Sequence, residues 1–238
     1  MRGDETLQDW ADYWNGRTTV YANDRHKRVH YEGIARDIIA LLPGPSARVL
    51  DYGCGEALSA DRVAEACRRL YLCDAARTVR ERLAERYASN PNIEVIAVSQ
   101  FEAMPAGTVD LIVANSVIQY LSQAQLERFL RVAWPTLRPR GRLVIADVIP
   151  RGLGPLQDAT ELLKFAAKNG FLLPAAAGLG RSFFSSYRRV RQQLGLLQFD
   201  EPEMLELLTR FGFEARRHYP NMGHNRRRMT FMASKGGT

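Results

Sequence analysis

Two acidic residues and two glycines in the first quarter or so of the chain have a spacing that suits a nucleoside-containing ligand. The run Val49-Leu50-Asp51-Tyr52-Gly53-Cys54-Gly55 places a buried-strand pattern directly before a glycine-rich turn. Glycine at both turn positions lets the backbone bend sharply and approach a ligand closely. Asp74 follows about 20 residues after Gly53, the offset at which an acid meets a ribose hydroxyl in nucleotide-binding α/β folds. We therefore expect Asp51, Gly53, Gly55 and Asp74 to form one binding site.

The same turn argues against a nicotinamide dinucleotide. The dinucleotide fingerprint has a third glycine three residues after the second, and this chain has Leu58 there. Asp51, two residues before Gly53, would also lie awkwardly near a pyrophosphate. A carboxylate at this position suits a ligand that carries a positive amino group.

Two histidines, His26 and His30, are four residues apart and share one face of a predicted helix. Lys27, Arg28 and Val29 lie between them, so the H-E-x-x-H pattern of a zinc site is absent. We therefore predict no metal site. The first interpretation of the pair is a solvated basic face, and the second is a general base in the substrate cleft.

The composition is that of a globular protein. The chain has 238 residues, of which 46% are hydrophobic and 25% charged. No apolar run reaches the ~18 residues that span a bilayer, and the N-terminal residues lack the apolar segment of a signal peptide. Three cysteines, Cys54, Cys67 and Cys73, form no CxxC pair and are interpreted as small buried residues. A cytoplasmic location is the resulting expectation.

The formal charge of +7 permits binding to nucleic acid, to a membrane surface or to an acidic substrate, and it establishes none of these. The basic helix expected at 182–194 has an apolar face that could touch a membrane or an amphiphilic substrate. A lid packed on its own domain is the commoner outcome. The sequence leaves the oligomeric state open.

Strands and helices are expected to alternate after residue 45. The expected strands are Arg48–Tyr52, Leu70–Cys73, Ile93–Val98, Val109–Asn115, Arg142–Val148, Phe213–Tyr219 and Met229–Lys235. The expected helices are Thr6–Trp14, Asp24–Leu42, Ser59–Arg69, Thr78–Ser89, Ala124–Leu137, Leu156–Lys168, Ser182–Leu194 and a last one that Asp200 caps and that runs through Phe211. This order predicts an α/β fold of the doubly wound, Rossmann-like type, with a mostly parallel sheet and a C-terminal antiparallel hairpin.

One domain, 1–238, is expected to contain four parts. These are an N-terminal helical cap (1–45), a cofactor-binding core (46–150), a helical lid inserted after the fifth strand (151–199), and a C-terminal helix with a strand hairpin (200–238). The lid is rich in apolar residues, among them Leu172, Leu173, Phe184 and Tyr187. We expect it to cover an acceptor pocket together with the N-terminal helices that carry Trp14 and Tyr21.

These motifs together resemble the class I S-adenosylmethionine-dependent methyltransferase family. The resemblance rests on Asp51–Gly55, on Asp74, on the strand Val109–Asn115 and on the turn Leu137–Leu143, which precedes the fifth strand in this family. It covers roughly residues 20–150 well and the last strands loosely. Each motif alone is weak, and the four in this order are specific.

The resemblance implies roles for the residues of the turn. The backbone of Gly53 and Gly55 would pass beneath the methionine part of S-adenosylmethionine, with Asp51 nearby. Asp74 would accept hydrogen bonds from both ribose hydroxyls. The cofactor implied by the family is therefore S-adenosylmethionine.

Further contacts are implied at the ends of the next strands. The family usually has an acid after its third strand to bind the adenine amino group, whereas this chain has Gln100 and Phe101 after Ser99. Gln100 could still accept through its amide oxygen. Asn115 would supply a backbone contact to the methionine amine. Tyr21 lies where relatives often close a lid over the cofactor.

The resemblance implies methyl transfer to an O, N or C atom of an acceptor, and the acceptor is expected to be a small molecule. The segment Asn115–Ile118 lacks the N-P-P-Y type of signature found in many base-methylating enzymes. A general base is needed only where the nucleophile must lose a proton, and His26, His30 and Tyr120 are the weak candidates. Two alternatives remain open: an RNA methyltransferase, and a non-catalytic binding or scaffold protein that has kept the fold.

Overall fold

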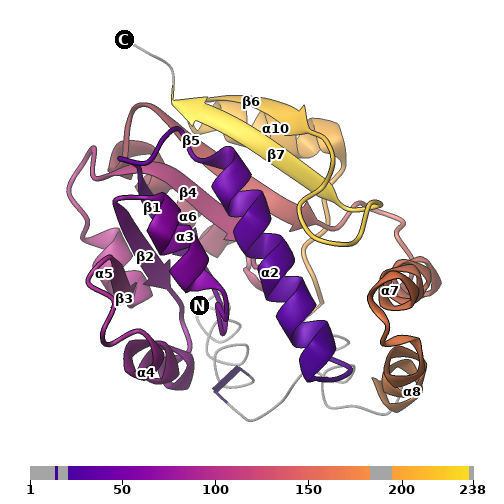
Figure 1. Cartoon of the computed structure of the whole chain (residues 1–238). Coiled ribbons are helices and arrows are strands. Elements are labelled where there is room, and N and C mark those ends of the chain that lie inside the picture. Colours follow the sequence, from indigo (N-terminus) through magenta and orange to yellow (C-terminus); the bar gives the residue numbers. More distant parts are fainter. Residues whose placement is uncertain (1–13, 16–20, 183–194, 236–238) are drawn as a thin grey trace.

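The structure is a computed structural model of the chain, and it describes residues 14–15, 21–182 and 195–235 (Figure 1). The predicted helix Thr6–Trp14 lies outside the described residues except for Trp14. The predicted helix Ser182–Leu194, which carries Phe184 and Tyr187, also lies outside them except for Ser182. The expected lid contacts of Phe184 and Tyr187 therefore stay predictions.

A seven-stranded sheet forms the centre of the molecule, in the order β3-β2-β1-β4-β5-β7-β6 (Figure 1). Its strands are β1 (Arg48–Tyr52), β2 (Arg69–Cys73), β3 (Ile93–Ile96), β4 (Val109–Asn115), β5 (Leu137–Val148), β6 (Phe213–His218) and β7 (Met229–Lys235). Strands β1 to β5 pair in parallel, and β7 is antiparallel to both β5 and β6. The predicted doubly wound sheet with a C-terminal antiparallel hairpin is confirmed.

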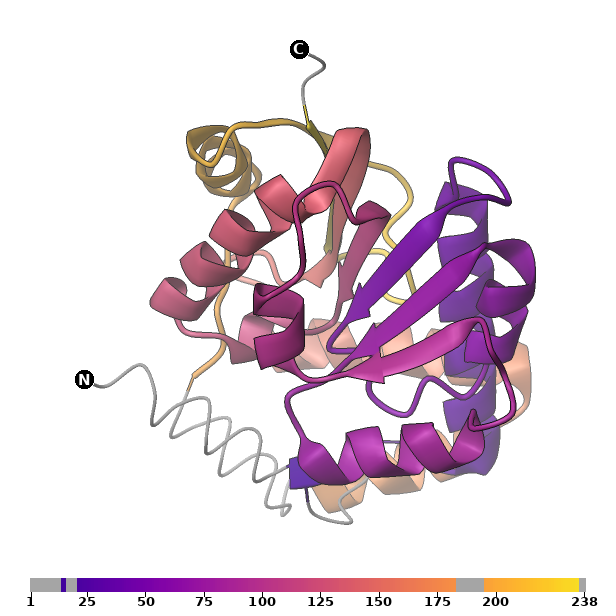
Figure 2. The same cartoon turned by 90° about the vertical axis from the view of Figure 1, so that its left-hand side faces the viewer.

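Helices cover both faces of the sheet (Figure 2). They are α2 (Asp24–Leu41), α3 (Ala60–Ala66), α4 (Arg77–Arg86), α5 (Val98–Glu102), the 3-10 helix η1 (Ile118–Tyr120), α6 (Gln123–Thr136), α7 (Pro155–Asn169), α8 (Leu172–Ser182) and α10 (Glu201–Arg210). On one face, α2, α3 and α4 bury residues such as Ile38 and Leu83. On the other face, α5, α6 and α10 bury residues such as Phe101 and Leu208. Because the parallel strands are covered on both sides, they read as continuous apolar runs.

Several predicted boundaries were wrong. Val98 begins α5 and does not end a strand, because the amide oxygen of Gln100 accepts a hydrogen bond from Ala97 N (2.8 Å) and starts a helix there. The N-cap of α2 is Asn23, not Asp24, since the Asn23 side chain accepts from His26 N (2.8 Å). Strand β5 begins at Leu137, five residues earlier than expected, where it pairs with Val109.

A helix also occupies the segment rich in Ala, Gly and Pro between the predicted helices Leu156–Lys168 and Ser182–Leu194, which we interpret from sequence as a loop. Gly170 takes a left-handed conformation (φ +73°) that ends α7, and α8 begins two residues later. Alanine has the highest helix propensity, and Pro174 lies in the first turn of α8, where proline is tolerated. Composition alone was therefore a poor guide here.

Helices α7 and α8 pack as a pair beside the N-terminal end of α2 (Figure 1). Their own small core consists of Ala166, Phe171 and Ala175. Leu172 and Leu173, two of the apolar residues expected to cover a pocket, are 45% and 83% exposed. Within the described part of the chain, none of the helices is long and apolar enough to cross a membrane.

Candidate functional site

The glycine-rich turn follows β1 and is tied to the end of β2. The N–H groups of Gly53 and Cys54 both donate to the carbonyl oxygen of Cys73, at 2.7 and 3.2 Å. Gly53 and Gly55 have φ of +70° and +59°, a region that strongly favours glycine. A Cβ at Gly53 would lie 2.4 Å from a methyl of Val117, which follows β4. The backbone of the turn therefore packs so closely against Val117 that only a residue without a side chain fits at position 53.

The Asp74 carboxylate holds this turn in shape. Asp74 directly follows β2, and its two oxygens accept hydrogen bonds from Gly55 N (3.0 Å) and Ala76 N (2.9 Å). Burial raises the pKa of Asp74, and the hydrogen bonds from Ala76 and Gly55 oppose that shift. A carboxylate offers about four acceptor positions, so this one retains capacity for further donors such as two hydroxyls.

Asp51 is a buried carboxylate in need of a positive partner. It is 8% exposed, and in the described part of the chain it has no hydrogen bond or ion pair. Burial, followed by repulsion from Asp74, raises the pKa of Asp51 to about 7. A buried carboxyl that is costly to ionise alone is stabilised in its charged form by a cation placed beside it. Asp51 therefore fits an ammonium group.

A second polar cluster marks the carboxyl ends of β4 and β5. Asn115 ends β4, and its side-chain oxygen is buried without a hydrogen-bond partner among the described residues. The next residue, Ser116, donates from its hydroxyl to Asp147 Oδ2 at 2.7 Å. Both Ser116 (φ +56°) and Asp147 (φ +62°) have left-handed backbones. Such conformations in non-glycine residues cost free energy and cluster at functional sites.

Tyr31, which sequence reasoning missed, closes the other side of the turn. Its hydroxyl accepts from Glu56 N (3.0 Å), and a Cβ at Gly55 would lie 2.9 Å from that hydroxyl oxygen. Lys27, one helical turn earlier on α2, pairs with Glu56 at 2.6 Å. The i, i+4 spacing of Lys27 and Tyr31 was the available signal that both face the same neighbour.

Comparisons with known proteins agree with this geometry. Residues 49–141, which contain the turn, Asp74 and Asn115, match the family model described as a methyltransferase domain. The chain contains a class I methyltransferase domain. Two probable S-adenosylmethionine-dependent methyltransferases of Mycobacterium tuberculosis, strains CDC 1551 and H37Rv, are each 35% identical to it over 195 residues. That alignment covers 75% of this chain and 64% of each relative's length.

Solved methyltransferase structures share the fold. The 1,6-didemethyltoxoflavin-N1-methyltransferase of Burkholderia thailandensis, with its acceptor and S-adenosylhomocysteine bound, has a TM-score of 0.56 at 18% identity, covering 91% of this chain and 84% of that one. The phosphoethanolamine N-methyltransferase 1 of Haemonchus contortus, also bound to acceptor and S-adenosylhomocysteine, has a TM-score of 0.52 at 22% identity, covering 61% and 32%.

Two residues predicted to contact adenine are already engaged within the methyltransferase domain. The amide oxygen of Gln100 accepts from Ala97 N (2.8 Å), so the acceptor expected for the adenine amino group serves its own helix. The side chain of Phe101 is 1% exposed and packs between Tyr52 and Phe129, at ring-centroid distances of 5.5 and 6.0 Å. Because its side chain is buried in the core, Phe101 can contact a ligand only through its backbone.

Tyr21 lies in an aromatic cluster at the N-terminal end of α2. Its hydroxyl is hydrogen-bonded to that of Tyr31, and its ring lies 5.5 Å from His30 and 5.3 Å from His26. Burial raises the pKa of Tyr21 to about 12, partly offset by the Tyr31 hydrogen bond. Tyr21 is thus in contact with Tyr31, the residue that closes the glycine turn, and its predicted place beside the cofactor stays a prediction.

The interpretation of His26 and His30 as a solvated basic face was wrong. His26 is 5% exposed and stacks on Phe171 at a ring-centroid distance of 4.8 Å. Burial, with His224 as a further cause, lowers the pKa of both histidines to about 4. Both rings are therefore neutral at physiological pH. Among the described residues, no group of three His, Cys, Asp or Glu side chains is placed to hold a metal ion.

The remaining predicted residues lie near the ends of the strands. Tyr120, in η1, makes an edge contact with Trp14 at 5.7 Å. Gln119 is buried, its amide donates to the Ser116 carbonyl (2.9 Å), and its side-chain oxygen has no partner in the described part of the chain. Cys54, Cys67 and Cys73 are buried and unpaired, as predicted.

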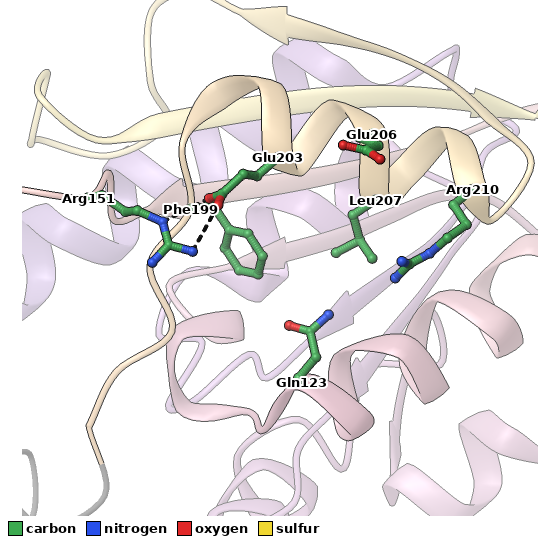
Figure 3. A pocket seen from close by; sticks show the side chains of 7 residues that line it. All are labelled: Gln123, Arg151, Phe199, Glu203, Glu206, Leu207 and Arg210. Carbon is green, nitrogen blue, oxygen red and sulfur yellow. Dashed lines mark hydrogen bonds and ion pairs between the residues drawn. The ribbon is translucent and has the colours of Figure 1, made fainter.

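A separate pocket of about 270 Å³ lies between α6 and α10 (Figure 3). It is lined by Gln123, Arg151, Phe199, Glu203, Glu206, Leu207 and Arg210. Arg151 pairs with Glu203 at 2.9 Å, and Arg210 pairs with Glu127 at 2.9 Å. Its lining comes from the sheet face that α6 and α10 cover, not from the glycine turn. Because both arginines are already paired, the pocket offers an anion no free cation of its own.

Proposed function

We propose that this chain transfers the methyl group of S-adenosylmethionine to an O, N or C atom of a small-molecule acceptor. The observation that carries the proposal is the pair Asp51 and Asp74, which lie at the carboxyl ends of the neighbouring strands β1 and β2, with two left-handed glycines between them in the sequence. Bound there, S-adenosylmethionine supplies a methyl group activated by its cationic sulfur. The names of the two mycobacterial relatives support the same activity.

The residues of the site fit such a ligand. Asp51 would face the amino group, because it is a buried carboxylate with no partner in the described part of the chain. Asp74 would accept from the ribose hydroxyls with the capacity its two backbone hydrogen bonds leave free. Asn115, with a buried and unsatisfied oxygen, is a further acceptor at the edge of β4. The contribution of these residues is to hold the methyl group in line with the acceptor, which is the proximity term in catalysis.

A small-molecule acceptor is favoured over RNA. Two solved methyltransferase structures with this fold hold a small molecule beside S-adenosylhomocysteine, phosphoethanolamine in one and 1,6-didemethyltoxoflavin in the other. Some of the 33 lysines and arginines are also engaged in ion pairs, which leave the net charge of +7 unchanged but occupy these side chains. Arginines on several elements pair with carboxylates, for example Arg69 with Glu94 and Arg128 with Glu102. An RNA-binding surface needs unpaired cations that neutralise phosphates.

Isothermal calorimetry with S-adenosylmethionine and with S-adenosylhomocysteine tests the central claim. We expect saturable binding of both, together with a higher melting temperature. An absence of binding by either would contradict the proposal. Turnover is then sought by incubating the chain and methyl-labelled S-adenosylmethionine with a metabolite pool and reading labelled products by mass. Strong, salt-dependent retention on heparin would instead support RNA as the acceptor.

A further inference from the structure

Three imidazoles meet at the carboxyl edge of the sheet, although they come from distant parts of the chain. His26 and His30 are on α2, whereas His224 is in the loop between β6 and β7. The ring centroid of His224 lies 6.3 Å from that of His30 and 6.4 Å from that of His26. The fourth histidine, His218, is at the end of β6 and shares none of these ring contacts with described residues. The cluster is thus a specific arrangement of three of the four histidines.

His26 differs from the other two because one of its ring nitrogens already accepts a hydrogen bond. Its Nδ1 accepts a hydrogen bond from Ala22 N (3.2 Å), so the proton of the neutral ring is on Nε2. Its face stacks on Phe171. Within the residues that the structure describes, neither His30 nor His224 has a hydrogen bond on its imidazole. Both are half-buried, so each presents an unused ring nitrogen to a sheltered environment.

The two unused imidazoles are connected from two sides to the site of the proposed methyl donor. Asp147 acts electrostatically on both His30 and His224, and it is hydrogen-bonded to Ser116 next to Asn115. From the other side, Tyr21 contacts His30 at 5.5 Å. The Tyr21 hydroxyl is in turn linked to Tyr31, which closes the glycine turn. The contacts through Asp147 lead to Asn115 at the end of β4, and the contacts through Tyr21 lead to the glycine turn after β1.

The charges around His224 make it the better proton acceptor of the pair. Burial lowers the pKa of His224, but the carboxylates of Asp147, Asp158 and Glu161 raise it, and Arg228 is the opposing cation. For His30, Asp147 is the one carboxylate that raises the pKa, and the two neighbouring imidazoles, His224 and His26, both lower it. An imidazolium that forms on His224 is therefore stabilised by three acids. Phe165 stacks on the His224 ring at 4.7 Å and fixes its plane.

We propose that His224 is the general base that takes a proton from the acceptor, and that the acceptor is a phenol-like molecule with its ionisable O–H on an aromatic ring. This inference rests on the proposed function. The acceptor oxygen forms a bond to the methyl carbon, the bond from that carbon to sulfur breaks with its electron pair remaining on sulfur, and the O–H proton passes to the His224 imidazole and then to water. His30 hydrogen-bonds the same oxygen, and its role is positioning.

The surroundings select this class of acceptor. Tyr21 and Phe165 provide aromatic surfaces beside the two imidazoles. A phenolic O–H has a pKa of ~10, so it is protonated at neutral pH and needs a base as its oxygen becomes the nucleophile.

The first experiment uses nuclear magnetic resonance on the full chain with ¹³C-labelled histidine rings, saturated with S-adenosylhomocysteine. Phenol is the probe. We expect saturable shifts of the His30 and His224 ring signals and an unchanged His218 signal. Absence of a saturable shift at His30 and His224, or an equal shift at His218, overturns the inference. Calorimetry of S-adenosylhomocysteine comes beforehand: no binding there overturns the proposed function as well, whereas normal binding followed by a negative phenol titration overturns this inference alone.

The second experiment measures anisole formation from phenol and S-adenosylmethionine, by mass, in wild type, His224→Gln and the matched control His218→Gln. We expect a loss of about 10²–10⁴-fold in His224→Gln, with unchanged S-adenosylhomocysteine affinity and loss of the acidic limb of the pH–rate profile. His218→Gln should keep the wild-type rate and profile. Wild type that binds phenol and forms no anisole, or His224→Gln that keeps rate and profile, overturns the proposal. His224→Asn replaces the Gln variant if melting curves show that the latter is unfolded.

Discussion

The hydroxyl of Ser116 and the carboxylate of Asp147 meet at 2.7 Å across the ends of β4 and β5, and each is held in a left-handed backbone conformation. Arg228 reaches the same Asp147 oxygen at 2.6 Å and also contacts Asp158 of α7 at 3.0 Å. The strained strand ends are thus linked to the helical pair α7–α8. Strain of this kind persists only where surrounding contacts hold it in place, and here an ion-pair network does so.

Asp74→Asn should weaken S-adenosylhomocysteine binding by about 1.5–3 kcal/mol, the range for hydrogen bonds to a charged group. The substitution keeps the size of the side chain, but its amide nitrogen cannot accept, so one of the hydrogen bonds from Gly55 N and Ala76 N is lost and the melting temperature should fall as well. Calorimetry gives the affinity and a melting curve gives the stability. Asp61→Asn, on the exposed side of α3, is the matched control and should bind normally. Equal affinities for the two variants would mean that the ribose lies elsewhere.

Binding of the same ligand should depend on the ionisation of Asp51. Burial and Asp74 raise the pKa of Asp51 to about 7, and only its ionised form attracts an ammonium. We therefore expect affinity to fall as pH drops below 7, approaching tenfold for each pH unit, because binding must then release a proton. Calorimetry between about pH 6 and pH 7.5 measures this slope. Asp51→Asn should bind weakly at every pH and show a flat profile; a wild-type profile that is equally flat would place the amino group away from Asp51.

Gly53→Ala should be more damaging than Gly152→Ala, although both glycines have left-handed backbones (φ +70° and +79°). The new methyl at Gly53 would lie 2.4 Å from Val117, whereas nothing lies within 4 Å of a Cβ at Gly152. The backbone strain, roughly 1–2 kcal/mol, is common to both variants. Urea unfolding should show an additional loss for Gly53→Ala, accompanied by loss of S-adenosylhomocysteine binding. Equal stabilities would show that Val117 can move aside.

The parts of the fold and of the site that the sequence predicts correctly are those determined by short, continuous stretches of the chain. The runs of β1, β4 and β7 match their predicted bounds, because each is an apolar stretch that ends at a glycine, a polar residue or a chain turn. Asp51 and Asp74 were found for the same reason, since each ends a strand next to the glycine turn.

The parts that were missed depend on residues that meet only in the fold. His224 is nearly 200 residues from His26 in the sequence, and no local pattern shows that the β6–β7 loop returns to α2. The burial of His26 was equally hidden, because the Phe171 ring that covers it lies at the start of α8, a helix mistaken for a loop. Periodicity indicates which face a residue occupies, but not which distant element covers that face.

Neutral buried histidines should make the fold sensitive to acid. The pKa of His26 and of His30 is lowered to about 4, so their contribution to stability is complete above about pH 6.5 and is lost as the pH falls through 4. Asp51 acts in the opposite direction: its raised pKa means that stability is lost as pH rises from 3.8 towards 7. His224, whose pKa burial also lowers, adds to the effect of His26 and His30, and Asp74, whose pKa burial raises, adds to that of Asp51. Three imidazoles outweigh two carboxyls, and each group is worth about 1.4 kcal/mol per pH unit at most.

The free energy of unfolding should therefore fall between about pH 6.5 and pH 4.5, as measured by urea titration at several pH values. His30→Gln removes one of the three buried imidazoles and should reduce the slope, whereas His218→Gln should leave it unchanged. In the Asp51→Asn background the slope should be steeper than in wild type. A slope that His30→Gln does not alter would mean that this ring is protonated as easily in the folded chain as in the unfolded one.

Arg228→Met should release α7 from the sheet. The substitution keeps an unbranched apolar stem but leaves Asp147 and Asp158 without their shared cation, and removal of one partner from such a buried network costs about 3–5 kcal/mol. Hydrogen exchange should then be faster in α7 and α8 than in wild type, while the protection of β1 and β4 remains. Arg216→Met, on the exposed edge strand β6, is the control and should change stability by less than about 0.5 kcal/mol.

If α7 and α8 act as a lid, S-adenosylhomocysteine should slow their exchange in wild type and in Arg216→Met, and much less in Arg228→Met. Protection that neither responds to ligand nor differs between the two arginine variants would show that the helical pair is fixed to the domain by other contacts and does not serve as a lid.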